Sequence, residues 1–95
     1  MKVSFNRLAS EELIAAARWF QRKAGLGAAF LAEYEEWEQQ IRQFPESCPE
    51  IAPAIRLGYL KRFKYHVTYT QREESIRILY VRHAKQVPLT RWPRR

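Results

Sequence analysis

The sequence predicts an α+β fold: a small antiparallel β-sheet packed against an antiparallel helical hairpin, in the order β-α-α-β-β-β. Two stretches, 10–24 and 27–44, repeat apolar residues at the three- and four-residue spacing of amphipathic helices. Three later stretches, 55–60, 65–70 and 76–81, are rich in β-branched and aromatic residues and are bounded by turn-forming residues. One strand, then two consecutive helices, then a run of strands is the order that favours a sheet with both helices on one face.

The first strand and the first helix follow from local signals. Residues Lys2–Asn6 alternate apolar and polar side chains, which predicts a short strand. Ser10 is the expected N-cap of the first helix, because two glutamates follow it in the turn where the helix dipole favours negative charge. Gly25 is expected to end this helix, since glycine readily adopts the left-handed conformation found there.

The second helix is expected to run from Gly27 to Phe44 and to stop before Pro45. Its expected apolar stripe consists of Phe30, Leu31, Tyr34, Trp37 or Glu38, Ile41 and Phe44. Glutamates line the other side, which we expect to be solvated. Because the link between the helices is very short, they must lie antiparallel. The proline-rich segment 45–53 is expected to be an irregular loop.

The strands of the second half place different chemistry on their two faces. In 65–70 the two tyrosines and Val67 share one face, whereas His66 and the two threonines share the other. The basic segment 61–64 is the expected hairpin between two strands. If the helices cover one face of this sheet, the other face and its rim must carry the charges of the second half.

The overall composition indicates a single domain over residues 1–95. A hydrophobic fraction of 46% excludes a disordered chain, and no apolar run approaches the length of a membrane span. The N-terminus lacks the apolar core of a secretion signal, so a cytoplasmic location is expected. Cys48 is the only cysteine, which excludes an internal disulfide and predicts a reducing compartment. Its role is left open.

Neither a metal site nor a cofactor site is indicated. The chain contains no Asp, which weakens any hard-cation site that needs converging carboxylates. His66 and His83 have no second His or Cys at metal-ligand spacing. The Gly-Leu-Gly sequence at Gly25–Gly27 is a helix break rather than a phosphate-binding loop.

The net charge of +7 is unevenly distributed. Residues 1–55 carry six Lys and Arg against eight Glu, a net charge of −2, whereas residues 56–95 carry eleven against two, a net charge of +9. Ordinary surfaces intersperse the two signs. The second half is therefore expected to bind a polyanion or an acidic protein partner.

The strand at 76–81 leads directly into a cluster of cations, and the hairpin supplies more. The residues expected to bind a macromolecular target are Arg56, Lys61, Arg62, Arg82, His83, Lys85 and Trp92. A tryptophan outside the core suggests an interface anchor.

Several short motifs, taken together with their order and spacing along the chain, resemble those of the RelE/ParE superfamily of toxins from type II toxin–antitoxin modules. They include R-x-x-x-L-x-R-F-x-Y-x-V-x-Y from Arg56 and I-x-I-L-x-V-x-H from Ile76. Arg18-Trp19-Phe20, the glycine break after the first helix and Phe44-Pro45-Glu46 add to the match. The resemblance covers nearly the whole chain and is more ParE-like than RelE-like.

The resemblance implies a plasmid-stabilisation toxin that arrests growth unless a cognate antitoxin binds it. The antitoxin would contribute an acidic or amphipathic segment, and the two chains would form a hetero-oligomer. The surface expected to meet it lies near Tyr59, Arg62 and Tyr80. For a ParE-like member, the implied target is DNA gyrase.

Two alternatives stay open. A RelE-like member would be a ribosome-dependent mRNA endonuclease, and Lys61, Arg62, Arg82, His83 and Lys85 would then carry the acid–base and phosphate chemistry. Many relatives continue the last strand as His-Gly-Arg-Arg-Asp, whereas this chain continues it as His-Ala-Lys-Gln-Val and has no tyrosine in its tail. The other alternative is a degenerate, non-toxic relative that only binds antitoxin.

Overall fold

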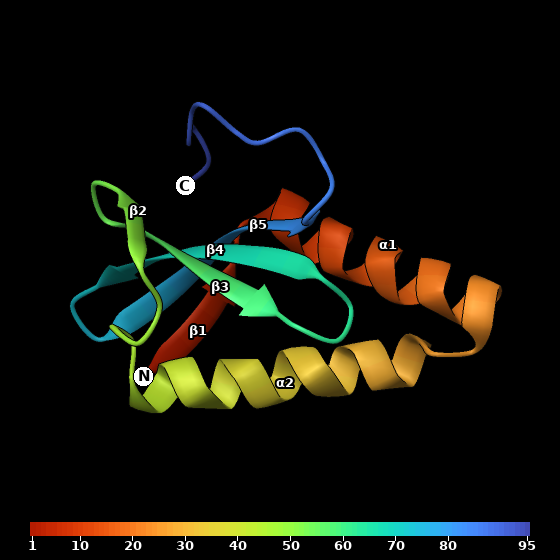
Figure 1. Cartoon of the computed structure of the whole chain (residues 1–95). Helices are drawn as coiled ribbons and strands as arrows, with labels where there is room; N and C mark the ends of the chain where they lie inside the picture. The colour runs from red at the N-terminus through yellow and green to blue at the C-terminus, as the bar shows by residue number, and fades with distance from the viewer.

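A computed structural model describes residues 1–95 and confirms the predicted α+β fold (Figure 1). Its elements are β1 (Lys2–Phe5), α1 (Arg7–Ala24), α2 (Gly27–Gln43), β2 (Glu50–Ala52), β3 (Ile55–Leu60), β4 (Tyr65–Arg72) and β5 (Ser75–His83). Strand β2 was not predicted, because the whole segment 45–53 was expected to be an irregular loop. It pairs briefly with the start of β3, and a tight turn with Ala54 in the left-handed region joins the two strands.

The five strands form one mixed sheet in the order β1-β5-β4-β3-β2. Strands β2 to β5 pair antiparallel, as expected, but β1 pairs parallel to β5. The expectation of a wholly antiparallel sheet is therefore wrong at this edge. Between β1 and the next strand the chain passes through both helices, so no hairpin turn dictates the direction in which β1 runs.

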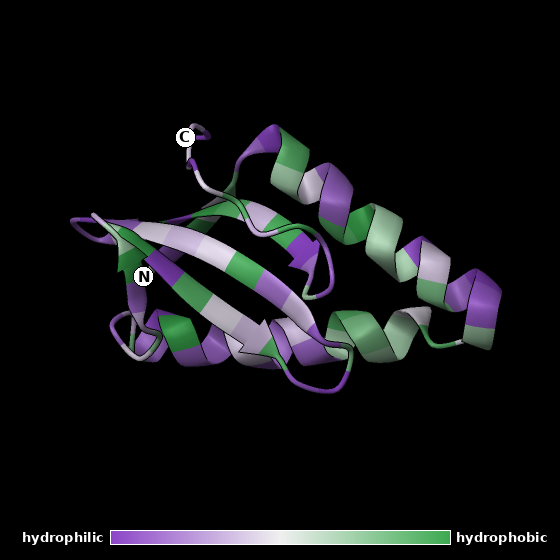
Figure 2. Ribbon diagram, turned by 45° about the horizontal axis from the view of Figure 1, so that its top comes forward, coloured by the Kyte–Doolittle hydropathy of each residue, from purple (hydrophilic) through white to green (hydrophobic).

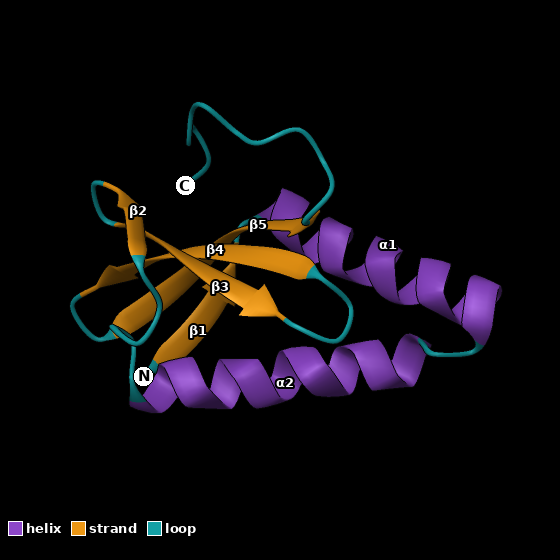
Figure 3. Cartoon of the chain, viewed as in Figure 1, coloured by secondary structure: helices purple, strands orange, loops and turns teal.

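Both helices lie against one face of the sheet, and the C-terminal tail, residues 84–95, arches over the other face (Figure 3). The main core between helices and sheet includes Phe30, Tyr34, Trp37 and Ile41 from α2 and Leu60, Val67, Tyr69, Ile76, Ile78 and Val81 from the strands. Phe44 was expected in this stripe but is exposed, because α2 ends one residue before it. Hydrophilic and hydrophobic bands alternate along both helices (Figure 2), and neither helix is long and apolar enough to cross a membrane.

The ends of α1 follow one prediction and contradict another. Asn6, not Ser10, is the N-cap: its side-chain oxygen accepts hydrogen bonds from the backbone N–H groups of Leu8, at 2.9 Å, and Ala9, at 3.4 Å. The helix thus begins earlier than expected, because Asn is as good a cap as Ser and comes first in the chain. Gly25 ends the helix with φ 66°, as predicted.

A close approach fixes α2 against β3. A Cβ atom placed on Gly58 would overlap the ring of Trp37, so the indole packs directly on the glycine backbone. Gly58 therefore allows the helix to sit at its observed distance from the sheet.

Candidate functional site

Cationic side chains gather at one end of the sheet. The turn between β3 and β4 lies beside the turn that follows β5, because the Ala84 N–H donates a hydrogen bond to the Lys64 carbonyl at 2.8 Å. This end carries Lys61, Arg62, Lys64, Arg82 and Lys85, which we call the cationic end. All but Arg82 are exposed.

The cationic end has no ion pair within the chain. The three salt bridges are Arg7–Glu11, Arg42–Glu38 and Arg94–Glu12. None of the five cations has a salt-bridge partner, and four of them are exposed to solvent, so positive charge predominates here although the Glu33 carboxylate lies beside the Arg62 amide. This is the arrangement expected of a surface that attracts a negatively charged partner.

Glu33 on α2 holds the backbone beneath this charge. Its carboxylate accepts hydrogen bonds from the N–H of Arg62 at 2.8 Å and from that of Phe63 at 3.4 Å. The expectation that the glutamate side of α2 is only solvated is thus wrong for this residue. The Arg62 guanidinium lies 5.0 Å from the centroid of the Phe63 ring, a cation–π distance that orients it.

His83 is held by its neighbours on both sides. Its N–H donates to Gln86 Oε1 at 2.7 Å, and its Nδ1 accepts from the Lys85 N–H at 3.0 Å. The ring packs edge-on against Tyr65, with 5.2 Å between centroids. Because Nδ1 is an acceptor, the neutral ring carries its proton on Nε2 and has no free acceptor nitrogen to serve as a base in this arrangement.

The other predicted target residues lie elsewhere. Arg56 donates from Nη1 to the carbonyls of Cys48, at 2.6 Å, and Glu46, at 3.2 Å, and so ties down the proline-rich loop. Trp92 lies in the tail, where its ring packs edge-on against Tyr80. The structure therefore brings Lys61, Arg62, Arg82, His83 and Lys85 to one end of the sheet. Arg56 lies apart from them at the start of β3, whereas Trp92 lines one cavity together with Arg82 and His83.

The tail is attached to the sheet by a set of contacts that the sequence did not reveal. Arg94 Nη1 donates to Glu12 Oε1 at 2.6 Å and to the Leu79 carbonyl at 3.2 Å. The Arg94 guanidinium also lies 4.1 Å from the centroid of the Tyr80 ring, which Trp92 contacts from another side. We call Glu12, Tyr80, Trp92 and Arg94 the tail clasp.

A β-bulge in β5 explains why a glutamate and an arginine meet here. Thr68 pairs with Tyr80 while Tyr69 pairs with Ile78, so Leu79 is an extra residue. Beyond this bulge β5 no longer has β1 beside it, and the Val81 N–H donates instead to Glu12 Oε1 at 3.1 Å. The clasp thus satisfies backbone groups that the sheet leaves unpaired.

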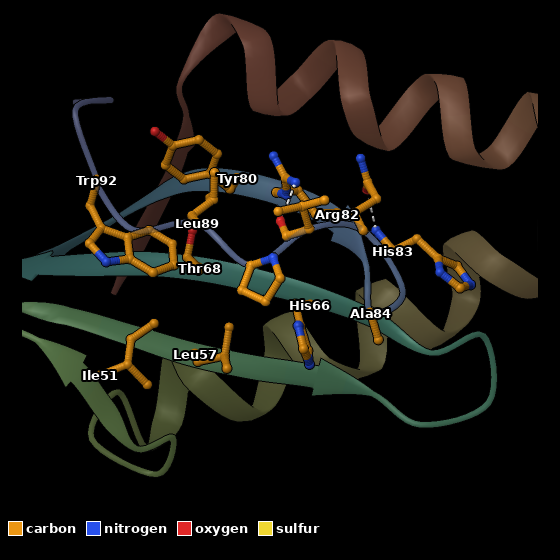
Figure 4. Close-up of a pocket in the computed structure, with 13 residues that line it drawn as sticks. Ile51, Leu57, His66, Thr68, Tyr80, Arg82, His83, Ala84, Leu89 and Trp92 are labelled. Carbon is orange, nitrogen blue, oxygen red and sulfur yellow. Dashed lines mark hydrogen bonds between the residues drawn. The ribbon is translucent and has the colours of Figure 1, made fainter.

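The tail partly covers a cavity of about 210 Å³ on the open face of the sheet, and this cavity remains open to solvent on one side (Figure 4). The sheet contributes Ile51, Leu57, His66, Thr68, Tyr80 and Arg82, and the tail contributes Val87, Pro88, Leu89 and Trp92. Burial, and then the charge of His83, lowers the pKa of His66, so this ring is neutral at physiological pH.

The residues expected to meet an antitoxin differ in accessibility. Tyr59 is 44% exposed and Arg62 is exposed, but Tyr80 is only 4% exposed, because Trp92 and Arg94 cover it. No group of three or more His, Cys, Asp or Glu side chains is placed to hold a metal ion.

This architecture has a counterpart among solved structures. A chain of the "Chromosomal ParDE TA system from P. aeruginosa" superposes on this one with a TM-score of 0.65. The two chains share one fold. The match covers 90% of this chain and 97% of that chain at 18% sequence identity, and it confirms the fold that the sequence resemblance implied. No family model matches the sequence, and a search of curated proteins finds no match.

Proposed function

We propose that this chain is the ParE-like toxin of a type II toxin–antitoxin module and that its cationic end binds the cellular target, DNA gyrase. The observation that carries the proposal is the unpaired cluster of Lys61, Arg62, Lys64, Arg82 and Lys85, on a fold shared with a chain of a ParDE system. Such a cluster steers association with a negatively charged surface.

Binding explains the geometry of the cationic end better than RNA cleavage does. Cleavage needs an acid or base within reach of the reacting oxygen. His83, the histidine of the cationic end, accepts the Lys85 N–H at Nδ1 and packs its ring on Tyr65. Arg82 donates from Nη2 to the Val87 carbonyl at 2.9 Å, which holds its guanidinium on the tail.

The proposed antitoxin contributes an acidic or amphipathic segment and forms a hetero-oligomer with this chain in the cytoplasm. Tyr59 and Arg62 are exposed and offer its first contacts. Tyr80 becomes available only when the tail clasp opens, since Trp92 and Arg94 lie on its ring.

A supercoiling assay with purified gyrase tests the target. The wild-type chain should inhibit supercoiling, and the double variant Arg62→Glu/Lys85→Glu should lose most of this inhibition. The matched control is Lys2→Glu/Arg72→Glu, which makes the same charge change at the opposite end of the sheet, where both residues flank Ser75. Full supercoiling at a large excess of the wild-type chain would contradict the proposal.

Two further readouts separate the alternatives. Primer extension on translated mRNA should show no cuts, and cuts at the ribosomal A site would assign the chain to the endonucleases instead. Expression of the chain alone should arrest growth of its host, whereas normal growth would point to a non-toxic relative that only binds antitoxin.

A further inference from the structure

The cavity beneath the tail is lined by apolar groups on two opposite sides. Leu57 of β3 forms part of its floor, and Pro88, Leu89 and Trp92 of the tail form its roof (Figure 4). Its volume of about 210 Å³ exceeds the roughly 150 Å³ of an engineered apolar cavity that takes up benzene. One aromatic ring with a small substituent therefore fits between the sheet and the tail.

One polar group in the floor has no partner. The Thr68 side chain is almost fully buried, at 3% exposure, and its hydroxyl makes no hydrogen bond within the protein. It is the only buried side-chain polar atom of the chain in this condition. Buried polar atoms are nearly always hydrogen-bonded, so an unpartnered hydroxyl favours a group that can satisfy it. The oxygen itself has almost no accessible surface, so such a group reaches it only if the covering side chains shift.

A cation lies next to this hydroxyl. Thr68 pairs with Tyr80 across β4 and β5, and Arg82 lies two residues farther along, so Thr68 and Arg82 are diagonal neighbours on the same face. Arg82 gives one hydrogen bond to the Val87 carbonyl and has no carboxylate partner. Diagonal neighbours lie roughly 7–8 Å apart, which allows one small anionic group to contact both side chains.

We propose that this cavity is a binding site for a small aromatic carboxylate with a single ring. The ring lies between Leu57 and the apolar residues of the tail, and the carboxylate accepts hydrogen bonds from the Arg82 guanidinium and, once the side chains that cover it shift, from Thr68 Oγ1. Arginine suits this role, because its planar fork matches the geometry of a carboxylate. The neutral His66 ring forms a side wall of the cavity and leaves the Arg82 charge uncompensated. The site does not depend on which cellular target the chain has.

Benzoate is the probe that tests the site, titrated into the full chain while methyl resonances of Leu57, Val87 and Leu89 are followed by NMR. These resonances should shift in a saturable manner, with a dissociation constant of about 1 mM or tighter for so few atoms. Benzyl alcohol has the same ring without the charge, so its affinity should be about tenfold lower, as expected when a charge-assisted hydrogen bond is lost.

Isosteric variants locate the contact. Thr68→Val removes the hydroxyl without changing the volume and should weaken benzoate binding about fivefold or more. Thr70→Val is the matched control, since Thr70 is a buried threonine of β4 that does not line the cavity, and it should leave the affinity unchanged. Leu57→Trp should abolish binding by filling the space. A dispersed spectrum of each variant establishes that it is folded.

Three results would overturn the proposal. The first is an absence of saturable shifts at about 10 mM benzoate, above the affinity expected for a ligand of this size. The second is equal binding of benzoate and benzyl alcohol, which would remove the role of Arg82. The third is equal loss of affinity in Thr68→Val and Thr70→Val, which would remove the role of the unpartnered hydroxyl.

Discussion

Replacing Arg94 with alanine tests how firmly the tail is held on the sheet. The change removes the Nη1 contacts to Glu12, at 2.6 Å, and to the Leu79 carbonyl, and it removes the cation from the Tyr80 ring. The Arg94 and Glu12 side chains are only 20% and 28% exposed, so the pair is partly shielded from solvent. A hydrogen bond to a charged group contributes about 1.5–3 kcal/mol and a cation–π contact about 0.5–1 kcal/mol when partly exposed. Allowing for solvent screening, we expect a loss of about 2 kcal/mol in the free energy of unfolding.

A double-mutant cycle isolates the contact itself. Urea denaturation of the wild type, Arg94→Ala, Glu12→Ala and the double variant gives the coupling between the two side chains, which we expect to be about 1 kcal/mol. Arg7 and Glu11 form the matched control, because they are also bridged but are 77% and 59% exposed. Their coupling should be about 0.3–0.5 kcal/mol, the usual value for such a helix pair.

The reasoning would be refuted by a coupling at Arg94 and Glu12 no larger than that of the exposed pair. Unchanged stability of Arg94→Ala would have the same effect, since it would mean that the tail does not rest on Tyr80. Loss of the clasp should also lower the midpoint of thermal unfolding by roughly 8–16 °C for a domain of this size. A scan by circular dichroism checks this independently of urea.

Three further substitutions test other parts of the fold. Gly58→Ala places a methyl group in the Trp37 ring and should cost about 1–3 kcal/mol in denaturant unfolding; a stable variant with unchanged tryptophan fluorescence would argue against this packing. Burial and the charge of His83 hold the pKa of His66 below its ordinary value of 6.5, so the unfolded chain binds more protons and stability should fall as pH drops below about 6.5. His66→Asn should reduce this pH dependence, measured as the change in the urea midpoint between pH 7.5 and lower pH. The same change in midpoint in the variant and the wild type would refute the role of His66. Glu33→Ala leaves two turn amides without their acceptor and should lower the free energy of unfolding by about 1–2 kcal/mol. Glu33→Gln should lower it less, because the amide oxygen can still accept a hydrogen bond; equal stability of both variants and the wild type would show that water replaces the carboxylate.

The parts of the fold that were predicted correctly rest on local signals. The break at Gly25 needs only a residue that tolerates positive φ, and the stop before Pro45 needs only a residue that cannot continue a helix. The strand faces of β4 follow from a two-residue period. The error at the start of α1 was also local: the two glutamates pointed to Ser10, but Asn6 is a cap of similar strength and comes earlier in the chain.

The features that were missed depend on residues far apart in the chain. Glu12 and Arg94 are separated by 82 positions, and Glu33 lies 29 positions from the turn that it holds. A glutamate on an exposed-looking helix side and an arginine in a tail are ordinary by themselves, so no local pattern marks them as partners. The parallel direction of β1 was missed for the same reason, since it is decided by how the helical hairpin packs and not by any turn.

The clasp also separates the two surfaces that the proposed function needs. The four exposed cations of the cationic end can be reached while the tail is closed, so contact with a target need not open it. Tyr80 can be reached only when the tail is open, and a closed state favoured by about 2 kcal/mol would lower the apparent affinity of a partner that requires Tyr80 about 30-fold. An antitoxin that first binds Tyr59 and Arg62 avoids most of this loss, because these contacts form before the clasp opens. In the proposed complex the tail therefore favours first contact of an antitoxin at Tyr59 and Arg62, while the four exposed cations stay accessible with the tail closed.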